Sequence, residues 1–201
     1  TALLLTIAGR MAFDTGRLRV DGHLLPQEAR AVRKSVALAE LSGLNDLEDN
    51  LSVEQQIAER LSIGSFGLWV SRRRVSPVLD ELNAALGQAH DEAGLPFEPV
   101  DGAALVSTLT RLERKLLGVV LALTDDPRIV VVDDADDLRA AEHVQLLWSA
   151  LAVLLADRDV TLVATVQAAS SAPAPTDRIP SERLHHLELD THRTLLELML
   201  P

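Results

Sequence analysis

Four consecutive β-branched residues, Ile129 to Val132, form the segment that most constrains the fold. Pro127 precedes this apolar run and the pair Asp133-Asp134 follows it, so both of its ends are sharply bounded. A short, unbroken apolar run of this kind is typical of a strand that is buried on both faces, as in parallel sheets covered by helices. The segment therefore predicts a central strand of an α/β sheet.

Helical and strand patterns alternate around this strand. Leucine and valine recur at spacings of three and four over residues 107–124, which predicts a helix with one buried face, and a second helix is outlined from Val144 to Leu155. Residues 159–167, DVTLVATVQ, predict a second buried strand. Because helices and buried strands alternate, we expect a parallel sheet flanked by helices.

Shorter elements are expected in the first half of the chain. They are a helix over residues 2–12, a strand over 17–20, a helix from Pro26 to Lys34, which uses the preference of proline for a first helical turn, and a strand over 35–39. Helical periodicity then covers residues 52–87, with expected interruptions at Gly64, Gly67 and Pro77. Residues 88–102 hold two glycines and two prolines, which predicts a connection.

Composition excludes several classes of function. The 201 residues carry a net charge of -11, which argues against nucleic-acid binding, because such binding depends mainly on clustered lysine and arginine. The sequence has no cysteine, which excludes disulfides and thiolate metal sites. Its longest apolar runs fall short of the roughly 20 residues that span a membrane, so we expect no direct membrane insertion.

A pair of acids follows the predicted central strand. In open α/β sheets, ligands bind at the carboxyl ends of the strands, and Asp133 and Asp134 lie at that end. They are therefore placed where a catalytic or metal-organising carboxylate would be needed. The alternative is that they only cap the next helix, and the pair alone does not separate these two interpretations.

The order of these segments resembles the nucleotide-binding domain of ATP-binding cassette (ABC) transporters. TALLLTIAG resembles the helix that follows the family's Walker A phosphate loop, and DTGRLRVDG resembles the next strand. The block from the signature motif to the Walker B strand resembles LTRLERKLLGVVLALTDDPRIVVVDDADDL. The strand before the switch histidine resembles VTLVATVQ. The resemblance covers nearly the whole chain, and it implies a cassette without its first strands and Walker A loop.

The resemblance implies an α/β fold with a P-loop NTPase-like core, in which helices flank a parallel sheet, plus a helical subdomain. Residues 1–51 and 108–201 would form the RecA-like core, incomplete at its N-terminus, and residues 52–107 the helical subdomain. Phe66 and Trp69 would contact a membrane subunit, or they are ordinary core residues. The implied cofactors are ATP and Mg²⁺.

Four residues take positions of the family's nucleotide site. Thr1 matches the hydroxyl that ligates Mg²⁺, and Asp133 matches the acid that holds this ion. Asp134 replaces the glutamate that polarises the attacking water; its side chain is shorter by about 1.5 Å, and a displacement near 1 Å costs about a hundredfold in rate. Gln167 replaces the switch histidine, and its amide can hydrogen-bond a γ-phosphate but carries no charge.

The remaining matches are weaker. Glu40 is the nearest match to the glutamine that senses γ-phosphate and Mg²⁺, or it is an ordinary exposed acid. Thr110, Arg111 and Glu113 fall in the signature motif, but both of its glycines, which allow the backbone to approach a phosphate, are replaced. Arg111 could bind phosphate with its guanidinium group, whereas a helix that only buries neighbouring leucines is the simpler interpretation.

Two functional hypotheses follow from the resemblance. The first is an ATP-binding subunit of a membrane transporter, cytoplasmic and peripheral to the membrane through an integral membrane subunit, with weak ATP hydrolysis and a homodimer as a candidate assembly. The second is a degenerate cassette that acts as a structural or regulatory subunit with little or no turnover. A third hypothesis is an unrelated α/β protein that binds a divalent ion through its acidic pair. This hypothesis does not explain the order of the matching segments.

Overall fold

The computed structural model describes residues 1–39, 45–63, 71–138 and 140–189. The helices are α1 (Ala2–Ile7), α2 (Ala29–Ser35), α3 (Val53–Ser62), α4 (Arg72–Ala93), α5 (Arg111–Leu123) and α6 (Ala141–Leu155). The strands are β1 (Leu18–Val20), β2 (His23–Leu25), β3 (Val36–Leu38), β4 (Ile129–Val132) and β5 (Thr161–Ala164). Short 3₁₀ turns occupy Val106–Thr108, Ala169–Ser171 and Ser181–Arg183.

Strands β3, β4 and β5 form a parallel sheet with β4 in the middle. Val131 of β4 pairs with Leu38 of β3 on one side and with Val163 of β5 on the other. This arrangement confirms the predicted α/β class and the position of the acidic pair at the end of a central strand. Strands β1 and β2 form a separate antiparallel hairpin.

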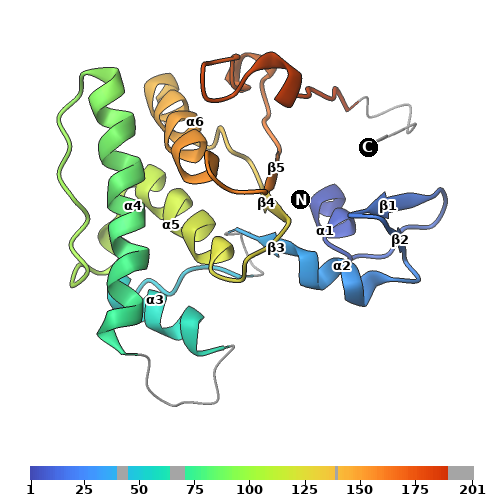
Figure 1. Cartoon of the computed structure of the whole chain (residues 1–201), viewed down its shortest axis with the longest axis horizontal. Helices are drawn as coiled ribbons and strands as arrows, with labels where there is room; N and C mark the ends of the chain where they lie inside the picture. Colours follow the sequence, from blue (N-terminus) through green and yellow to red (C-terminus); the bar gives the residue numbers. More distant parts are fainter. Residues whose placement is uncertain (40–44, 64–70, 139, 190–201) are drawn as a thin grey trace.

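The central strand is buried on both faces, as its sequence predicts. Val130 and Val132 contribute to an apolar core with α3, α4, α5 and α6. Ile129 and Val131 contribute to a second core with α1, α2 and the β1–β2 hairpin. These two groups of elements lie on opposite sides of the sheet (Figure 1).

Helix α5 begins later than the sequence periodicity predicts. The expected start at residue 107 is wrong, because Val106–Thr108 form a 3₁₀ turn and the helix begins at Arg111. Thr110 and Glu113 form a capping box, in which each side chain accepts a hydrogen bond from the backbone N–H of the other residue. Such a box fixes the first turn, because it satisfies two N–H groups that lack helical partners.

Helix α4 is longer than predicted. Pro77, an expected interruption, lies inside the helix, where it cannot donate a hydrogen bond to the carbonyl of Arg73. Residues 88–93, expected in a connection, are helical, and the helix ends at Gly94, whose φ of 66° lies in the left-handed region that favours glycine.

Two shorter helices also differ from their predicted bounds. Helix α1 stops at Ile7 instead of residue 12, because the chain turns at Gly9, where φ is 64°. Helix α2 begins at Ala29 and not at Pro26. Residues 24–28 close a turn first, in which the backbone N–H of Leu24 donates to the Glu28 carboxylate and the N–H of Glu28 donates to the carbonyl of Leu24.

Within the described ranges, no helix is both long enough and apolar enough to cross a membrane. The division into a core and a helical subdomain remains a prediction. Phe66 and Trp69 lie outside the described residues, so their assignment also stays a prediction.

Candidate functional site

The carboxyl ends of the three parallel strands meet at one edge of the sheet. Strand β4 leads into Asp133 and Asp134, and β5 leads into Thr165 and Val166. The backbone N–H of Thr165 donates to the carbonyl of Val132, so the pairing of the two strands extends into this edge. This edge brings several of the predicted site residues together.

Asp133 is held by two hydroxyl groups. The hydroxyl of Thr165 donates to Oδ1 of Asp133 over 2.7 Å, and the hydroxyl of Thr1 donates to Oδ2. Partial burial by itself raises the pKa of Asp133, but the hydrogen bonds from the Thr1 and Thr165 hydroxyls outweigh it and lower the pKa. Asp133 is therefore a carboxylate at neutral pH.

Asp134 has an unusual backbone conformation, and its carboxylate accepts no hydrogen bond from the described residues. Its φ is 44°, in the left-handed region that is uncommon for residues other than glycine. Its N–H donates to the hydroxyl of Thr165 over 2.9 Å, and the ammonium group of Lys115 donates to the carbonyl oxygens of both Asp133 and Asp134. In the described part of the chain, no side chain or backbone group donates a hydrogen bond to the Asp134 carboxylate.

Side chains in the signature segment form hydrogen bonds and an ion pair with other residues of the same chain. The hydroxyl of Thr110 accepts from the N–H of Glu113 and donates to its carboxylate. One guanidinium nitrogen of Arg111 lies 2.9 Å from each carboxylate oxygen of Asp137, in the loop that follows β4. These contacts link the start of α5 to the acidic loop, which is defined here as residues 133–137.

Gln167 lies beyond the acidic pair rather than against it. Its backbone N–H donates to both carboxylate oxygens of Asp136, at 2.9 and 3.0 Å, and the N–H of Ala168 also donates to Asp136. Burial raises the pKa of Asp136, but these backbone hydrogen bonds and one from the Ser171 side chain lower it below its usual range. Asp136 thus ties the loop after β5 to the loop after β4, while the side chain of Gln167 stays exposed.

The structure therefore groups some predicted residues and not others. Thr1 and Asp133 are in contact, Asp134 is adjacent, and Thr110, Arg111 and Glu113 lie at the start of α5, next to the acidic loop. Glu40 lies outside the described residues.

Three contributing residues were missed by sequence reasoning: Thr165, Lys115 and Asp136. Thr165 could have been found, because it directly follows β5 and so aligns with Asp133 across the sheet edge. Lys115 and Asp136 act through contacts to backbone groups, for which the sequence carries no recognisable signal.

The oxygen groups at this edge fit a hard cation that is held partly by a ligand. Among the described residues, no group of three or more histidine, cysteine or acidic side chains could hold a metal alone. Mg²⁺ in nucleotide sites is usually held by one or two protein oxygens plus phosphate oxygens and water. The Asp133 carboxylate and Thr1 hydroxyl are oxygen ligands of this kind, and they are already in contact.

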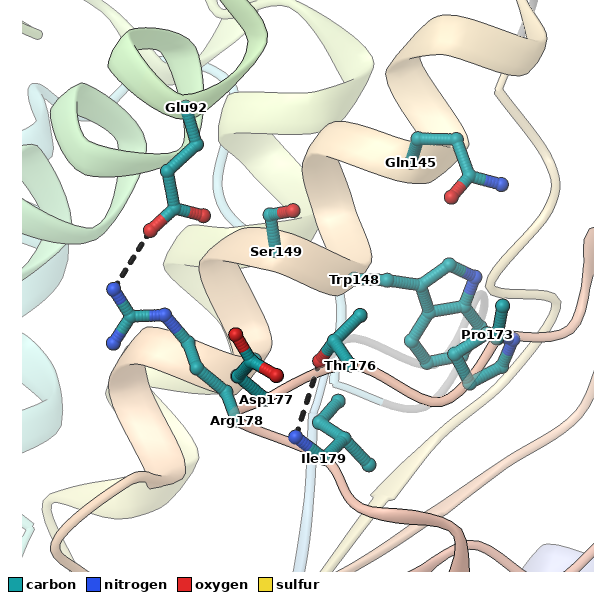
Figure 2. Close-up of a pocket in the computed structure, with 11 residues that line it drawn as sticks. Glu92, Gln145, Trp148, Ser149, Pro173, Thr176, Asp177, Arg178 and Ile179 are labelled. Carbon is teal, nitrogen blue, oxygen red and sulfur yellow. Dashed lines mark hydrogen bonds and ion pairs between the residues drawn. The ribbon is translucent and has the colours of Figure 1, made fainter.

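A separate pocket lies away from this edge. It has a volume of about 410 Å³ and lies between the end of α4, helix α6 and residues 173–179 (Figure 2). Arg178 closes one side through an ion pair of 2.7 Å with Glu92, and Trp148 lies on the side nearer to Gln145 and Pro173. None of the predicted site residues lines this pocket.

Comparison with known proteins identifies relatives in sequence, although no family model matches the chain. The chain is 27% identical over 175 residues to the Nod factor export ATP-binding protein I of Rhizobium etli, covering 86% of this chain and 49% of that protein. It is 25% identical over 166 residues to the arabinose import ATP-binding protein AraG of Rhizobium meliloti, covering 81% and 30%. The chain thus spans half the length of these relatives or less.

Solved structures show the same relationship at the level of the fold. The structure of cbiO1 from Clostridium perfringens, part of the ABC transporter complex cbiONQ, matches with a TM-score of 0.58 and 16% identity, over 83% of this chain and 61% of that one. The dimeric structure of MJ0796, a bacterial ABC transporter cassette, matches with a TM-score of 0.59 and 14% identity, over 84% and 70%. The sequence relatives and the structural neighbours agree: the chain is similar in sequence to ABC ATP-binding proteins and has the fold of ABC cassettes.

Proposed function

We propose that the chain is an ATP-binding subunit of an ABC-type membrane transporter, which couples ATP binding and slow hydrolysis to an integral membrane partner. The observation that carries this proposal is the contact of Asp133 with the Thr1 and Thr165 hydroxyls at the carboxyl end of β4. Relatives in sequence are named as ATP-binding proteins, and one structural neighbour, a post-hydrolysis state of MJ0796, is bound to ADP and phosphate.

The residues at the sheet edge would divide the work of nucleotide binding. Asp133 and the Thr1 hydroxyl would hold Mg²⁺, which when bound neutralises phosphate charge. The lowered pKa of Asp133 supports this role, because a metal ligand must be deprotonated. Glu40 and the Gln167 amide are proposed to contact the γ-phosphate and the atoms around it.

Asp134 is proposed to orient and deprotonate the attacking water. Its carboxylate is free of protein partners in the described part of the chain, so a water molecule can reach it. Compared with a glutamate, however, the carboxylate is set back by about 1.5 Å. A general base must lie within hydrogen-bond reach of the proton it accepts, so we expect slow turnover.

A second candidate function is a degenerate cassette that acts as a structural or regulatory subunit, with little or no turnover. The contacts of the signature segment favour it. Thr110 and Glu113 cap their own helix, and the guanidinium group of Arg111 is paired with Asp137. Groups that are engaged in this way must give up those hydrogen bonds before they can bind a phosphate.

The assembly follows from the same proposal. We propose an integral membrane partner and a cytoplasmic location peripheral to the membrane from the names of the relatives, which describe export, import and an ABC transporter complex. A homodimer is proposed from the dimeric structure of MJ0796. Residues 52–107 would form the helical subdomain that faces the partner.

Phosphate release from Mg-ATP separates the two candidate functions. Slow turnover that is lost in both Asp133→Asn and Asp134→Asn would support the ATPase. Mg-dependent ATP binding without turnover would support the regulatory subunit. If neither binding nor turnover is found, both nucleotide-dependent proposals are wrong.

A further inference from the structure

Lys115 connects helix α5 to the backbone of the acidic pair. Its ammonium nitrogen donates to the carbonyl oxygen of Asp133 over 3.0 Å and to that of Asp134 over 2.9 Å. Lys115 lies four residues after Arg111, so both cations project from the same face near the start of the helix. Lys115 is half-buried, and its ammonium group binds the turn that follows β4.

The backbone that Lys115 holds is conformationally costly. Asp134 has a φ of 44°, and a residue in the left-handed region persists only when its surroundings fix it there. Within its own loop, the N–H of Asp137 donates to the Asp134 carbonyl, and two further anchors act on this residue from other elements. The Thr165 hydroxyl accepts its N–H from the side of β5, and Lys115 binds its carbonyl from the side of α5.

The negative charge of the acidic loop favours a cation as the group that holds its backbone. Four carboxylates, those of Asp133, Asp134, Asp136 and Asp137, fall within five residues. Arg111 pairs with Asp137 at the exposed end of this loop. The Lys115 ammonium group lies at the other end, where it offsets the repulsion between the paired acids and donates to the carbonyls of Asp133 and Asp134. The Asp134 carbonyl also accepts from the N–H of Asp137.

We propose that Lys115 is a positioning residue, which fixes the left-handed turn at Asp134 and thereby the direction in which the Asp134 carboxylate points. The consequence for hydrolysis rests on the function proposed above. The effect on the backbone does not, so the two can be tested separately.

Amide hydrogen exchange tests the effect on the backbone without any nucleotide. In Lys115→Met, which keeps most of the apolar stem but removes the donors, we expect the amides of Asp134 and Ala135 to exchange at least tenfold faster. Lys115→Arg should restore much of the protection. The matched control is Arg60→Met, which removes another cation that donates to a backbone carbonyl, that of Leu121, away from the acidic loop.

The outcomes of this test are distinct. Faster exchange at Asp134 and Ala135 in Lys115→Met, with core amides such as that of Val131 unchanged, supports the proposal. Unchanged exchange at both amides overturns it, and so does a uniform increase across the whole chain, which indicates a general loss of stability. Should Lys115→Met fail to fold, Lys115→Gln, which keeps a shorter donor, takes its place under the same criteria.

A kinetic measurement tests the consequence for hydrolysis. We expect Lys115→Met to lower kcat for Mg-ATP at least tenfold with little change in KM, because the direction of Asp134 changes while Asp133 keeps its hydroxyl partners. An equal rise in KM would contradict a role limited to Asp134. If the unaltered chain shows no turnover, the proposed ATPase fails, whereas the exchange result still decides whether Lys115 positions the turn.

Discussion

Thr165 holds Asp133 and Asp134 at the same time. Its hydroxyl donates to the Asp133 carboxylate over 2.7 Å and accepts the N–H of Asp134 over 2.9 Å. One side chain directly after β5 therefore fixes both the charge and the backbone of the acidic pair that follows β4.

Replacing Thr165 with valine, which has a similar shape, tests this relationship. We expect the pKa of Asp133 to rise, because burial then acts against fewer hydrogen bonds. We also expect the free energy of unfolding to fall by about 1–2 kcal/mol, since two hydrogen bonds are lost. NMR titration and urea denaturation measure the two effects. Thr161→Val, at the exposed start of β5, should change neither.

Lengthening the side chain of Asp134 should increase turnover. In Asp134→Glu the carboxylate reaches about 1.5 Å further, and correct placement of a catalytic group is worth up to about a hundredfold in rate. Phosphate release under saturating Mg-ATP measures this gain. A lower or unchanged rate in Asp134→Glu, with the protein folded, would argue against the assignment of Asp134 as the base and in favour of the degenerate cassette.

The cap of α5 should contribute to stability in the same way as another cap in the chain. Thr110→Ala removes the hydroxyl of one capping box, and we expect a loss of about 1 kcal/mol in the free energy of unfolding. Ser52→Ala removes the equivalent hydroxyl at α3 and should cost a similar amount. If Thr110 also contacts nucleotide, Thr110→Ala lowers ATP turnover more than Ser52→Ala does. Equal effects on turnover would assign Thr110 to the cap alone.

Acid should destabilise the protein through Asp136. Its folded-state pKa lies below the value of about 3.9 expected for the unfolded chain, so its contribution to stability is complete above that value and is lost as the pH falls through the folded-state pKa. We expect Asp136→Asn to flatten the pH dependence of the urea midpoint below about pH 4. Asp159→Asn, at a carboxylate whose side chain is 94% exposed, is the control and should leave this dependence as it is.

The strands of the parallel sheet could be predicted from the sequence, but β2 and the strand order were not predicted. Burial on both faces gives β4 its unbroken apolar run, whereas the expected burial of β5 is wrong, because Thr161 is exposed and the rest of that strand is only partly buried. Strand β4 matches its prediction residue for residue, and β5 falls inside the predicted segment. The start of α5 could not be predicted from periodicity, because Leu109 continues the apolar spacing although it lies outside the helix. The pair Thr110 and Glu113 carried that information, as a hydroxyl followed three residues later by an acid.

The candidate site was predictable in part. Asp133 could be placed because a strand end positions it and its partners are other side chains. Lys115 and Asp136 could not, since they bind backbone groups that are brought close only by the packing of α5 and of the loop after β5. Pro26 shows the same limit, because a turn between Leu24 and Glu28 displaces the helix that proline was expected to begin.

Calorimetric titration of Mg-ATP into the chain tests the central claim most directly, with Asp133→Asn as the variant and Asp126→Asn as its control at the other end of β4. Where the natural protein has residues before Thr1, the longer form is titrated as well. The account predicts Mg-dependent binding that Asp133→Asn weakens at least tenfold and Asp126→Asn leaves unchanged. Binding that is absent from both forms, or that is the same in all variants, would contradict a nucleotide site at the end of β4.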